Sequence, residues 1–222
     1  MATVIEEPVM YEVHITIDPY DSNMEPAVER FKAFCKNKNI KVTEILIRIL
    51  NTYRQKEGYP NLALLPMTSL RFYGTFNNAL RYMESLAKEF AEQGFQVTRK
   101  KIEAPSNVMT LPPVKYYEAH FDIFLKDSEN DHDWESDIPL FKYIPYMTKD
   151  GFKSGFSRNV KRPANEVSYT VQNFHLTEIL DFLNAFGTFE TFKNNAAELR
   201  GVVVEKILYD SNRNQDRTWM LY

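Results

Sequence analysis

The chain has 222 residues, of which 44% are hydrophobic and 14% aromatic, and its formal net charge at pH 7 is −3. The length fits one large domain or two packed halves, and the charge does not indicate wholesale electrostatic binding to nucleic acid. A single cysteine, Cys35, excludes an internal disulfide framework. The acidic start of the chain and the lack of a long apolar run predict neither a secretory signal nor a membrane span. We therefore expect a cytoplasmic, soluble protein.

The first half of the chain is predicted to form a β-α-β-β-α-β series. The expected elements are strand 10–18, helix 25–37, strand 41–50, strand 67–73, helix 76–93 and strand 95–103. The helix over 76–93 is indicated by apolar residues at helical spacing, which are Phe76, Leu80, Met83, Leu86 and Phe90. Gly94 is placed to end it. This element order is that of a ferredoxin-like sandwich, in which helices cover one face of an antiparallel sheet.

The second half is predicted to repeat the first, with strand 115–125, a strand near 166–174, a helix from 176 and strand 202–209. Tyr11-Glu12-Val13-His14 is echoed by Tyr117-Glu118-Ala119-His120. Thr68 and Glu103 are 35 residues apart (103 − 68), as are Thr170 and Glu205 (205 − 170). Matched offsets of this kind are typical of internal duplication. We predict an α+β fold of two tandem ferredoxin-like halves, 1–110 and 111–222, packed as one globular unit. The alternative is one irregular α+β domain.

Both strands that contain the repeated motif alternate polar and apolar residues. Side chains repeat every two residues along a strand, so each strand has one polar face. The polar residues are Glu12, His14 and Thr16 on one strand, and Glu118, His120 and Asp122 on the other. Such a face is typical of an antiparallel sheet open to water, with cross-strand Glu–His pairing. Two carboxylates and two imidazoles would also suit zinc, iron or manganese if the strands converge.

The segments His14-Ile15-Thr16-Ile17 and His120-Phe121-Asp122-Ile123 resemble the motifs of the two-histidine phosphoesterases. In that family, two His-hydrophobic-(Ser/Thr)-hydrophobic motifs lie on equivalent strands of two ferredoxin-like halves. The resemblance implies a metal-independent phosphodiesterase or cyclic-phosphate hydrolase, without a cofactor, acting on RNA ends or a cyclic nucleotide. It implies His14 and His120 as general base and acid, and Thr16 as a phosphate ligand. Asp122 departs from the pattern, since a carboxylate repels a phosphodiester.

Further candidate substrate-binding residues are Arg71, Asp122, Arg158 and Asn159, with Arg71 or Arg158 as the cation that holds the phosphate. Ser157-Arg158-Asn159 and Tyr209-Asp210-Ser211-Asn212 also resemble segments of a bacterial family of unknown function, which implies no activity.

The region after the predicted strand 115–125 departs from the repeat. Acidic residues at every second position from 127 to 137 predict a solvated loop, and a calcium loop would need a glycine that is missing. A basic segment from Lys142 to Arg162 with interleaved aromatic residues has a composition that can contact nucleic acid. Residues 138–156 break the repeat and mix aromatic and basic side chains, which is typical of an interface. We predict a contact surface for a homo-oligomer there. The alternative function is thus a non-catalytic binding or assembly protein of unknown partner.

Overall fold

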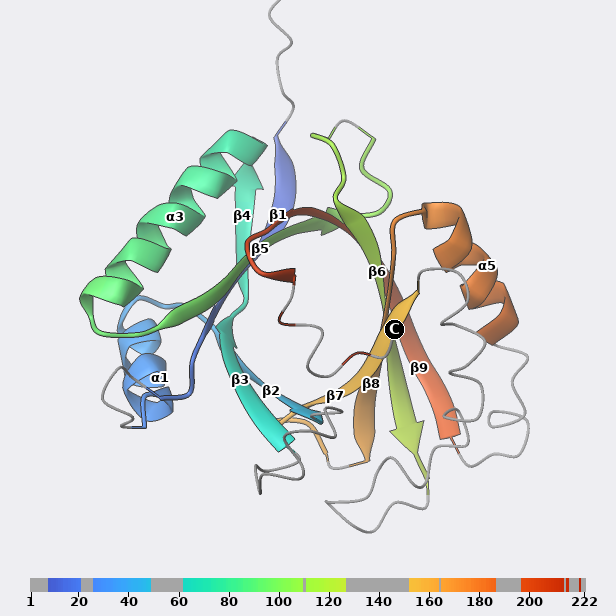
Figure 1. Cartoon of the computed structure of the whole chain (residues 1–222), viewed down its shortest axis with the longest axis horizontal. Helices are drawn as coiled ribbons and strands as arrows, with labels where there is room; N and C mark the ends of the chain where they lie inside the picture. Colours follow the sequence, from blue (N-terminus) through green and yellow to red (C-terminus); the bar gives the residue numbers. More distant parts are fainter. Residues whose placement is uncertain are drawn as a thin grey trace, which may run out of the picture. The chain divides into compact units, whose positions relative to one another are not determined.

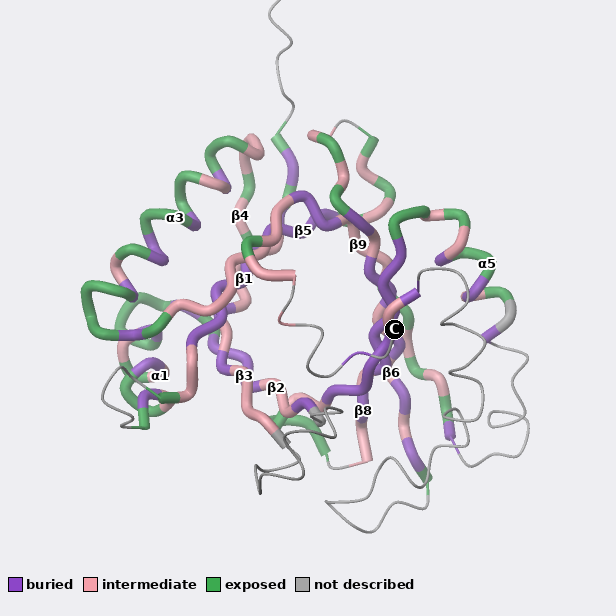
Figure 2. The backbone as a smooth tube through the Cα atoms, in the orientation of Figure 1, coloured by how far each residue is buried: buried purple, intermediate pink, exposed green. Residues whose placement is uncertain are grey.

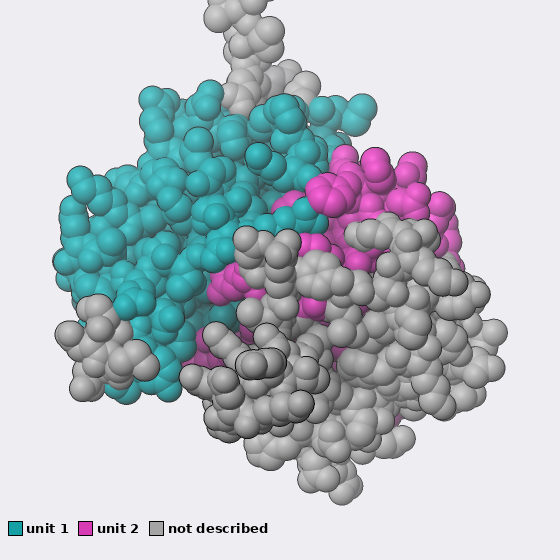
Figure 3. Space-filling model, viewed as in Figure 1, with its two compact units in different colours: residues 1–44, 65–115, 205–213 teal, residues 45–64, 116–204, 214–222 magenta. Residues whose placement is uncertain are grey.

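The computed structural model describes residues 8–20, 26–48, 62–109, 111–126, 152–163, 165–186, 197–213, 215 and 220. The chain forms two compact units, each discontinuous in sequence (Figure 3). Unit 1 comprises residues 1–44, 65–115 and 205–213, and unit 2 comprises residues 45–64, 116–204 and 214–222. Figure 1 labels the helices and strands.

Unit 1 is built on strands β1 (Val9–Ile17), β4 (Leu70–Gly74) and β5 (Val97–Pro105), with helices α1 (Val28–Asn37) and α3 (Phe76–Glu92). The Thr75 hydroxyl caps α3 by accepting a hydrogen bond from the Asn78 amide, and Gly94 follows the helix at a φ of 81°. The odd-numbered residues of β1 are buried in a core that includes Phe31, Met83 and Phe90. The sequence prediction of helix 76–93 is therefore confirmed.

Unit 2 contains β6 (Tyr116–Leu125), β7 (Lys153–Asn159), β8 (Glu166–Asn173) and α5 (Leu176–Phe186). Its core is aromatic, and the ring centroids of Phe121 and Phe186 lie 4.2 Å apart. Three further strands, β2 (Val42–Arg48), β3 (Leu62–Thr68) and β9 (Ala197–Asp210), have residues in both units. Figure 2 shows that buried residues concentrate on the strands, whereas the helices keep an exposed side.

The predicted fold class, two tandem ferredoxin-like halves related by internal duplication, is wrong. The strands follow the order β3-β2-β7-β8-β6-β9-β5-β1-β4, and β3 also pairs with β1. Eight strands therefore form a closed series of hydrogen-bonded neighbours, with β4 added beside β1. A ferredoxin-like half would keep its pairings within its own sheet.

Strand pairing between distant parts of the sequence explains why the observed strand order differs from the predicted one. Strand β2 pairs antiparallel with β7, and β5 pairs antiparallel with β9. A strand at a sheet edge presents unpaired N–H and C=O groups. Here the edge of each predicted half is satisfied by a strand from the other half of the sequence, so two separate sheets do not form.

Two predicted regions lie wholly or partly outside the described residues. These are the acidic segment 127–137, of which nothing is described, and the contact segment 138–156, which is described only from residue 152. Phe152 and Phe156, at its described end, are buried in the core of unit 2. Within the described part of the chain, no helix has the length and apolar character needed to cross a membrane.

Candidate functional site

His14 is buried on the polar face of β1, with both ring nitrogens in hydrogen-bonding contact. Its Nδ1 lies 2.9 Å from the backbone carbonyl oxygen of Thr68, and its Nε2 lies 3.1 Å from Oε2 of Glu103 on β5. A carbonyl and a carboxylate are both acceptors, so a fully protonated imidazole donates to each of them. The geometry thus favours the charged form of His14, although its side chain is only 10% exposed.

Further charged groups surround this imidazole within unit 1. Lys101 forms an ion pair with Oε1 of Glu103, and Oε1 of Glu12 lies 4.0 Å from His14 Nε2. The Ser69 hydroxyl donates a hydrogen bond to Glu12 at 2.6 Å. Burial lowers the pKa of His14 and Lys101 adds to that, but the charge of Glu103, its hydrogen bond and Glu12 outweigh them. The net effect is a pKa raised above the ordinary 6.5.

His120, at the corresponding place in β6, has different neighbours. Its Nδ1 lies 3.0 Å from the Thr170 hydroxyl, and its Nε2 lies 3.3 Å from Oε2 of Glu118 on its own strand. Glu118 is buried, and its Oε1 accepts a hydrogen bond from Gln172 at 2.8 Å. The His120 side chain is 30% exposed. Each motif histidine therefore contacts a carboxylate, within unit 1 for His14 and within unit 2 for His120.

Much of the two polar faces is buried, contrary to the expectation for a simple antiparallel sheet open to water. The members with under a tenth of their surface exposed are His14, Thr16, Thr68, Glu103, Glu118, Thr170 and Gln172. Burying polar groups costs free energy unless they are hydrogen-bonded or paired. The contacts described above supply that compensation for His14, Glu103, Glu118, Thr170 and Gln172, and the Thr68 hydroxyl accepts a hydrogen bond from the Ile15 amide.

The remaining predicted site residues are distributed over both units. Thr16 is buried on β1, and Arg71 is exposed on β4 opposite Glu12. Arg158 and Asn159 are half-buried at the end of β7, and the Asn159 side chain accepts a hydrogen bond from the Lys161 amide. Asn159 thus stabilises the turn that follows β7.

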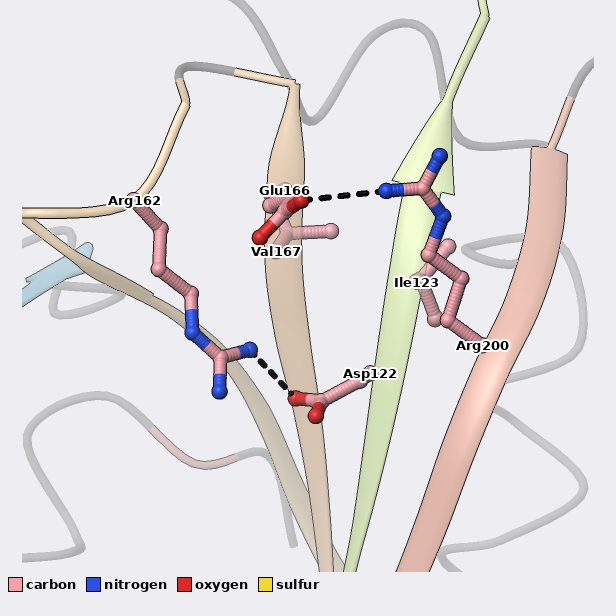
Figure 4. A pocket seen from close by; sticks show the side chains of 6 residues that line it. All are labelled: Asp122, Ile123, Arg162, Glu166, Val167 and Arg200. Atoms are coloured by element: carbon pink, nitrogen blue, oxygen red, sulfur yellow. Dashed lines mark hydrogen bonds and ion pairs between the residues drawn. The ribbon is translucent and has the colours of Figure 1, made fainter.

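Asp122 lines a pocket in unit 2 with a volume of about 350 Å³. Figure 4 shows the lining residues, which are Asp122, Ile123, Arg162, Glu166, Val167 and Arg200. They come from β6, β8, β9 and the turn after β7. Two of its four charged side chains are cationic and two are anionic.

The four charges form two ion pairs at the pocket. Arg162 Nη1 lies 2.9 Å from Asp122 Oδ1, and Arg200 Nη1 lies 3.1 Å from Glu166 Oε1 (Figure 4). All four side chains keep between 25% and 46% of their surface exposed. The guanidinium carbon of Arg200 also lies 3.8 Å from the ring centroid of Phe124, which fixes its position.

Sequence reasoning identified Asp122 as a site residue and Arg162 only as part of a basic segment, and it did not identify Glu166 or Arg200. Arg162, Glu166 and Arg200 lie in three separate segments without a shared motif. Phe124 is opposite Glu166 in the β6–β8 register, which only the strand pairing reveals. Among the described residues, no group of three or more His, Cys, Asp or Glu side chains is arranged to hold a metal ion.

No family model matches this sequence, and no curated protein is similar to it at a significant level. Two solved structures of chlorite dismutase from Candidatus Nitrospira defluvii, one a mutant and one in complex with imidazole, resemble the chain with TM-scores of 0.34 and 0.32. They are 10% and 11% identical to it, and the alignments cover 90% and 89% of this chain and 92% and 90% of theirs. Likeness at this level carries no conclusion about activity.

Proposed function

We propose that this protein binds a small phosphate ester with free hydroxyl groups, such as a nucleoside monophosphate or a sugar phosphate, without transforming it. The observation that carries the proposal is the pocket of unit 2, where two guanidinium groups and two carboxylates line about 350 Å³. That volume is in the range of small-molecule sites.

The two arginines are suited to hold the phosphate. A half-exposed ion pair contributes at most about 1 kcal/mol, so a ligand displaces it at little cost. A phosphate dianion carries more charge than the carboxylate it replaces and accepts two parallel hydrogen bonds from one guanidinium. Arg200 is held against Phe124, which reduces the entropy lost on binding.

The two carboxylates select for hydroxyl groups on the same ligand. Asp122 and Glu166 would repel a bare phosphate ion, because all three are anions. Once released from the arginines, they become acceptors for sugar hydroxyls, which is how carboxylates bind ribose in many nucleotide sites. The pocket therefore favours a phosphate ester over inorganic phosphate and over a neutral sugar.

Calorimetric titration of the full chain tests this selectivity with ribose 5-phosphate, AMP, inorganic phosphate and ribose. We expect at least one of the two esters to bind at least tenfold more tightly than phosphate or ribose. Arg162→Gln and Arg200→Gln should each weaken that binding about tenfold or more. Arg81→Gln, on the exposed surface of α3, is the matched control and should change nothing. Equal binding of ester and inorganic phosphate, or no effect of both pocket variants, would contradict the proposal.

Gly201 offers a second, steric test. A Cβ at this position would lie 3.9 Å from Asp122 Oδ2, an ordinary contact. Gly201→Ala should therefore fold and bind, whereas Gly201→Leu should extend toward Asp122 and reduce binding. If the leucine variant binds as well as the alanine variant, the ligand lies elsewhere.

A second candidate is the phosphodiesterase or cyclic-phosphate hydrolase activity implied by the motif resemblance. It is supported by the contact of each motif imidazole with a carboxylate, an arrangement that orients histidine for proton transfer. Hydrolysis of 2′,3′-cyclic nucleotides by the purified chain is the test. His14→Ala and His120→Ala should each lower the rate by about 10²–10⁴, and His175→Ala at the start of α5 should not. A wild-type chain without hydrolysis excludes this candidate.

A further inference from the structure

Strand β4 lies at the end of the strand order, where β1 is its only neighbour among the described strands. It pairs with β1 from Leu70 to Gly74, so its other edge presents backbone groups that no described strand satisfies. An open edge of this kind is a template for strand addition. Natural proteins protect such edges with charges or use them to bind partners.

Exposed apolar side chains flank this edge. Tyr73 is 68% exposed, and Met10, directly opposite it on β1, is 46% exposed. On the other face Tyr82, which is 40% exposed, stacks on Phe72 with ring centroids 5.4 Å apart. Arg71 is exposed on the same face as Tyr73. Apolar surface on both faces of an open edge is typical of an interface.

We infer that two copies of this chain pair antiparallel through β4, about a twofold axis that passes between the two Phe72 residues. In this register Leu70 lies opposite the partner's Gly74, and Arg71 lies opposite the partner's Tyr73. Symmetry produces the Arg–Tyr pair twice, and each cation–π contact stabilises the dimer. The edge strand is therefore complementary to itself, which identifies the partner as a second copy of this chain.

Other registers are less favourable. A twofold axis perpendicular to the sheet keeps each face on its own side, so it pairs only residues that share a face. A shift centred on Arg71 places two guanidinium groups directly opposite each other, which is destabilising. A shift centred on Tyr73 shortens the ladder and removes both Arg–Tyr pairs. The register centred on Phe72 pairs all five residues of β4.

Sedimentation equilibrium tests the dimer and its complementarity. The wild-type chain should dimerise reversibly, and Arg71→Tyr and Tyr73→Arg should each raise the dissociation constant about tenfold or more. The double variant exchanges the two residues and re-creates the same pair, so it should recover most of the affinity. A wild-type chain that stays monomeric at its highest soluble concentration would overturn the inference, as would a double variant that is as weak as the worse single variant.

Disulfide trapping tests the register itself. Directly opposite residues of an antiparallel pair have Cα atoms about 4.5–5.5 Å apart, which a disulfide spans. A mixture of the Arg71→Cys and Tyr73→Cys proteins should form a cross-linked dimer under mild oxidation, and neither protein alone should do so at a comparable rate. Native Cys35 is buried and does not compete. Equal cross-linking by Arg71→Cys alone would overturn the register. The absence of any cross-link, with both variants folded by circular dichroism, would overturn the interface.

Discussion

The same Glu-x-His motif has two different electrostatic environments in β1 and in β6. In β1, Glu12 is opposite Glu103, and His14 is opposite Lys101. In β6, Glu118 is opposite Gln172, and His120 is opposite Thr170. On the β5 side the first motif thus faces two charged residues, and on the β8 side the second faces two neutral ones.

This difference determines how each histidine is held. In unit 1, two carboxylates face each other on neighbouring strands, and the charges of His14 and Lys101 offset them. In unit 2, the Gln172 amide donates to Glu118, so a neutral donor shares this carboxylate with His120. The motif alone therefore does not define the chemistry of its histidine, because the neighbouring strand supplies the charge.

The largest expected effect is on stability, when Glu103 is replaced. Glu103→Ala would leave a buried, protonated His14 and a partly buried Lys101 without their shared partner, at a cost of about 3–5 kcal/mol in the free energy of unfolding. Glu118→Ala should cost about 1–3 kcal/mol, because it breaks hydrogen bonds of neutral or half-exposed partners. Urea denaturation of both variants measures the difference. A larger loss for Glu118→Ala would contradict the proposed contrast.

A double variant sharpens this result. Lys101→Met together with Glu103→Gln removes one cation and one anion, which leaves Glu12 as the carboxylate near His14, as Glu118 is the carboxylate near His120. We expect the double variant to lose less free energy of unfolding than the sum of the losses of the two single variants. The difference, which is the coupling energy, should be about 0.5–3 kcal/mol. The same urea series provides the measurement. Strict additivity would show that Lys101 and Glu103 do not act as a unit.

The two histidines should also differ in their effect on the pH dependence of stability. The pKa of folded His14 lies above 6.5, so its stabilising contribution is complete below pH 6.5 and is lost as the pH rises through the folded pKa. Each unit of pKa difference corresponds to about 1.4 kcal/mol. His14→Gln should remove this decline in the free energy of unfolding. His120→Gln should leave the decline in place, and a variant series measured from pH 5 to 9 decides between these outcomes.

The smallest expected effect is a difference in stability loss between substitutions of Thr68 and Thr170. The Thr68 hydroxyl accepts a hydrogen bond from the buried Ile15 amide at 2.9 Å, so Thr68→Val should cost about 1–3 kcal/mol. The Thr170 hydroxyl contacts a half-exposed His120, which water can reach, so Thr170→Val should cost less than about 1 kcal/mol. Thermal unfolding with matched Thr→Ser variants as controls measures both. Equal losses would remove the distinction between the two environments.

The sequence was sufficient to predict elements with strong periodicity or end signals. Helix 76–93, strand 10–18 and strand 115–125 are confirmed within two residues at each end. Strand β7 was not predicted, because Gly155 and two serines interrupt its hydrophobic pattern. Predicted strand 67–73 is divided at Ser69 into β3 and β4.

Strand order and cross-strand partners could not be predicted in the same way. The matched offset of Glu103 indicates repetition, whereas in the structure its carboxylate contacts His14. That contact depends on which strands become neighbours, and an alternating pattern leaves this choice open. The same reason explains why the charged pocket residues Glu166 and Arg200 were not identified together.

The pairing of β5 with β9 has a consequence for folding. Lys101 is opposite Asp210, and 109 residues separate them (210 − 101). Pairings of such large sequence separation slow folding, because the loop must close before its contacts form. During synthesis, β5 must wait for β9 with one edge unsatisfied, and such edges are prone to aggregation. The efficiency with which this chain reaches its native state in a cell should therefore depend on how long a chaperone can shield β5.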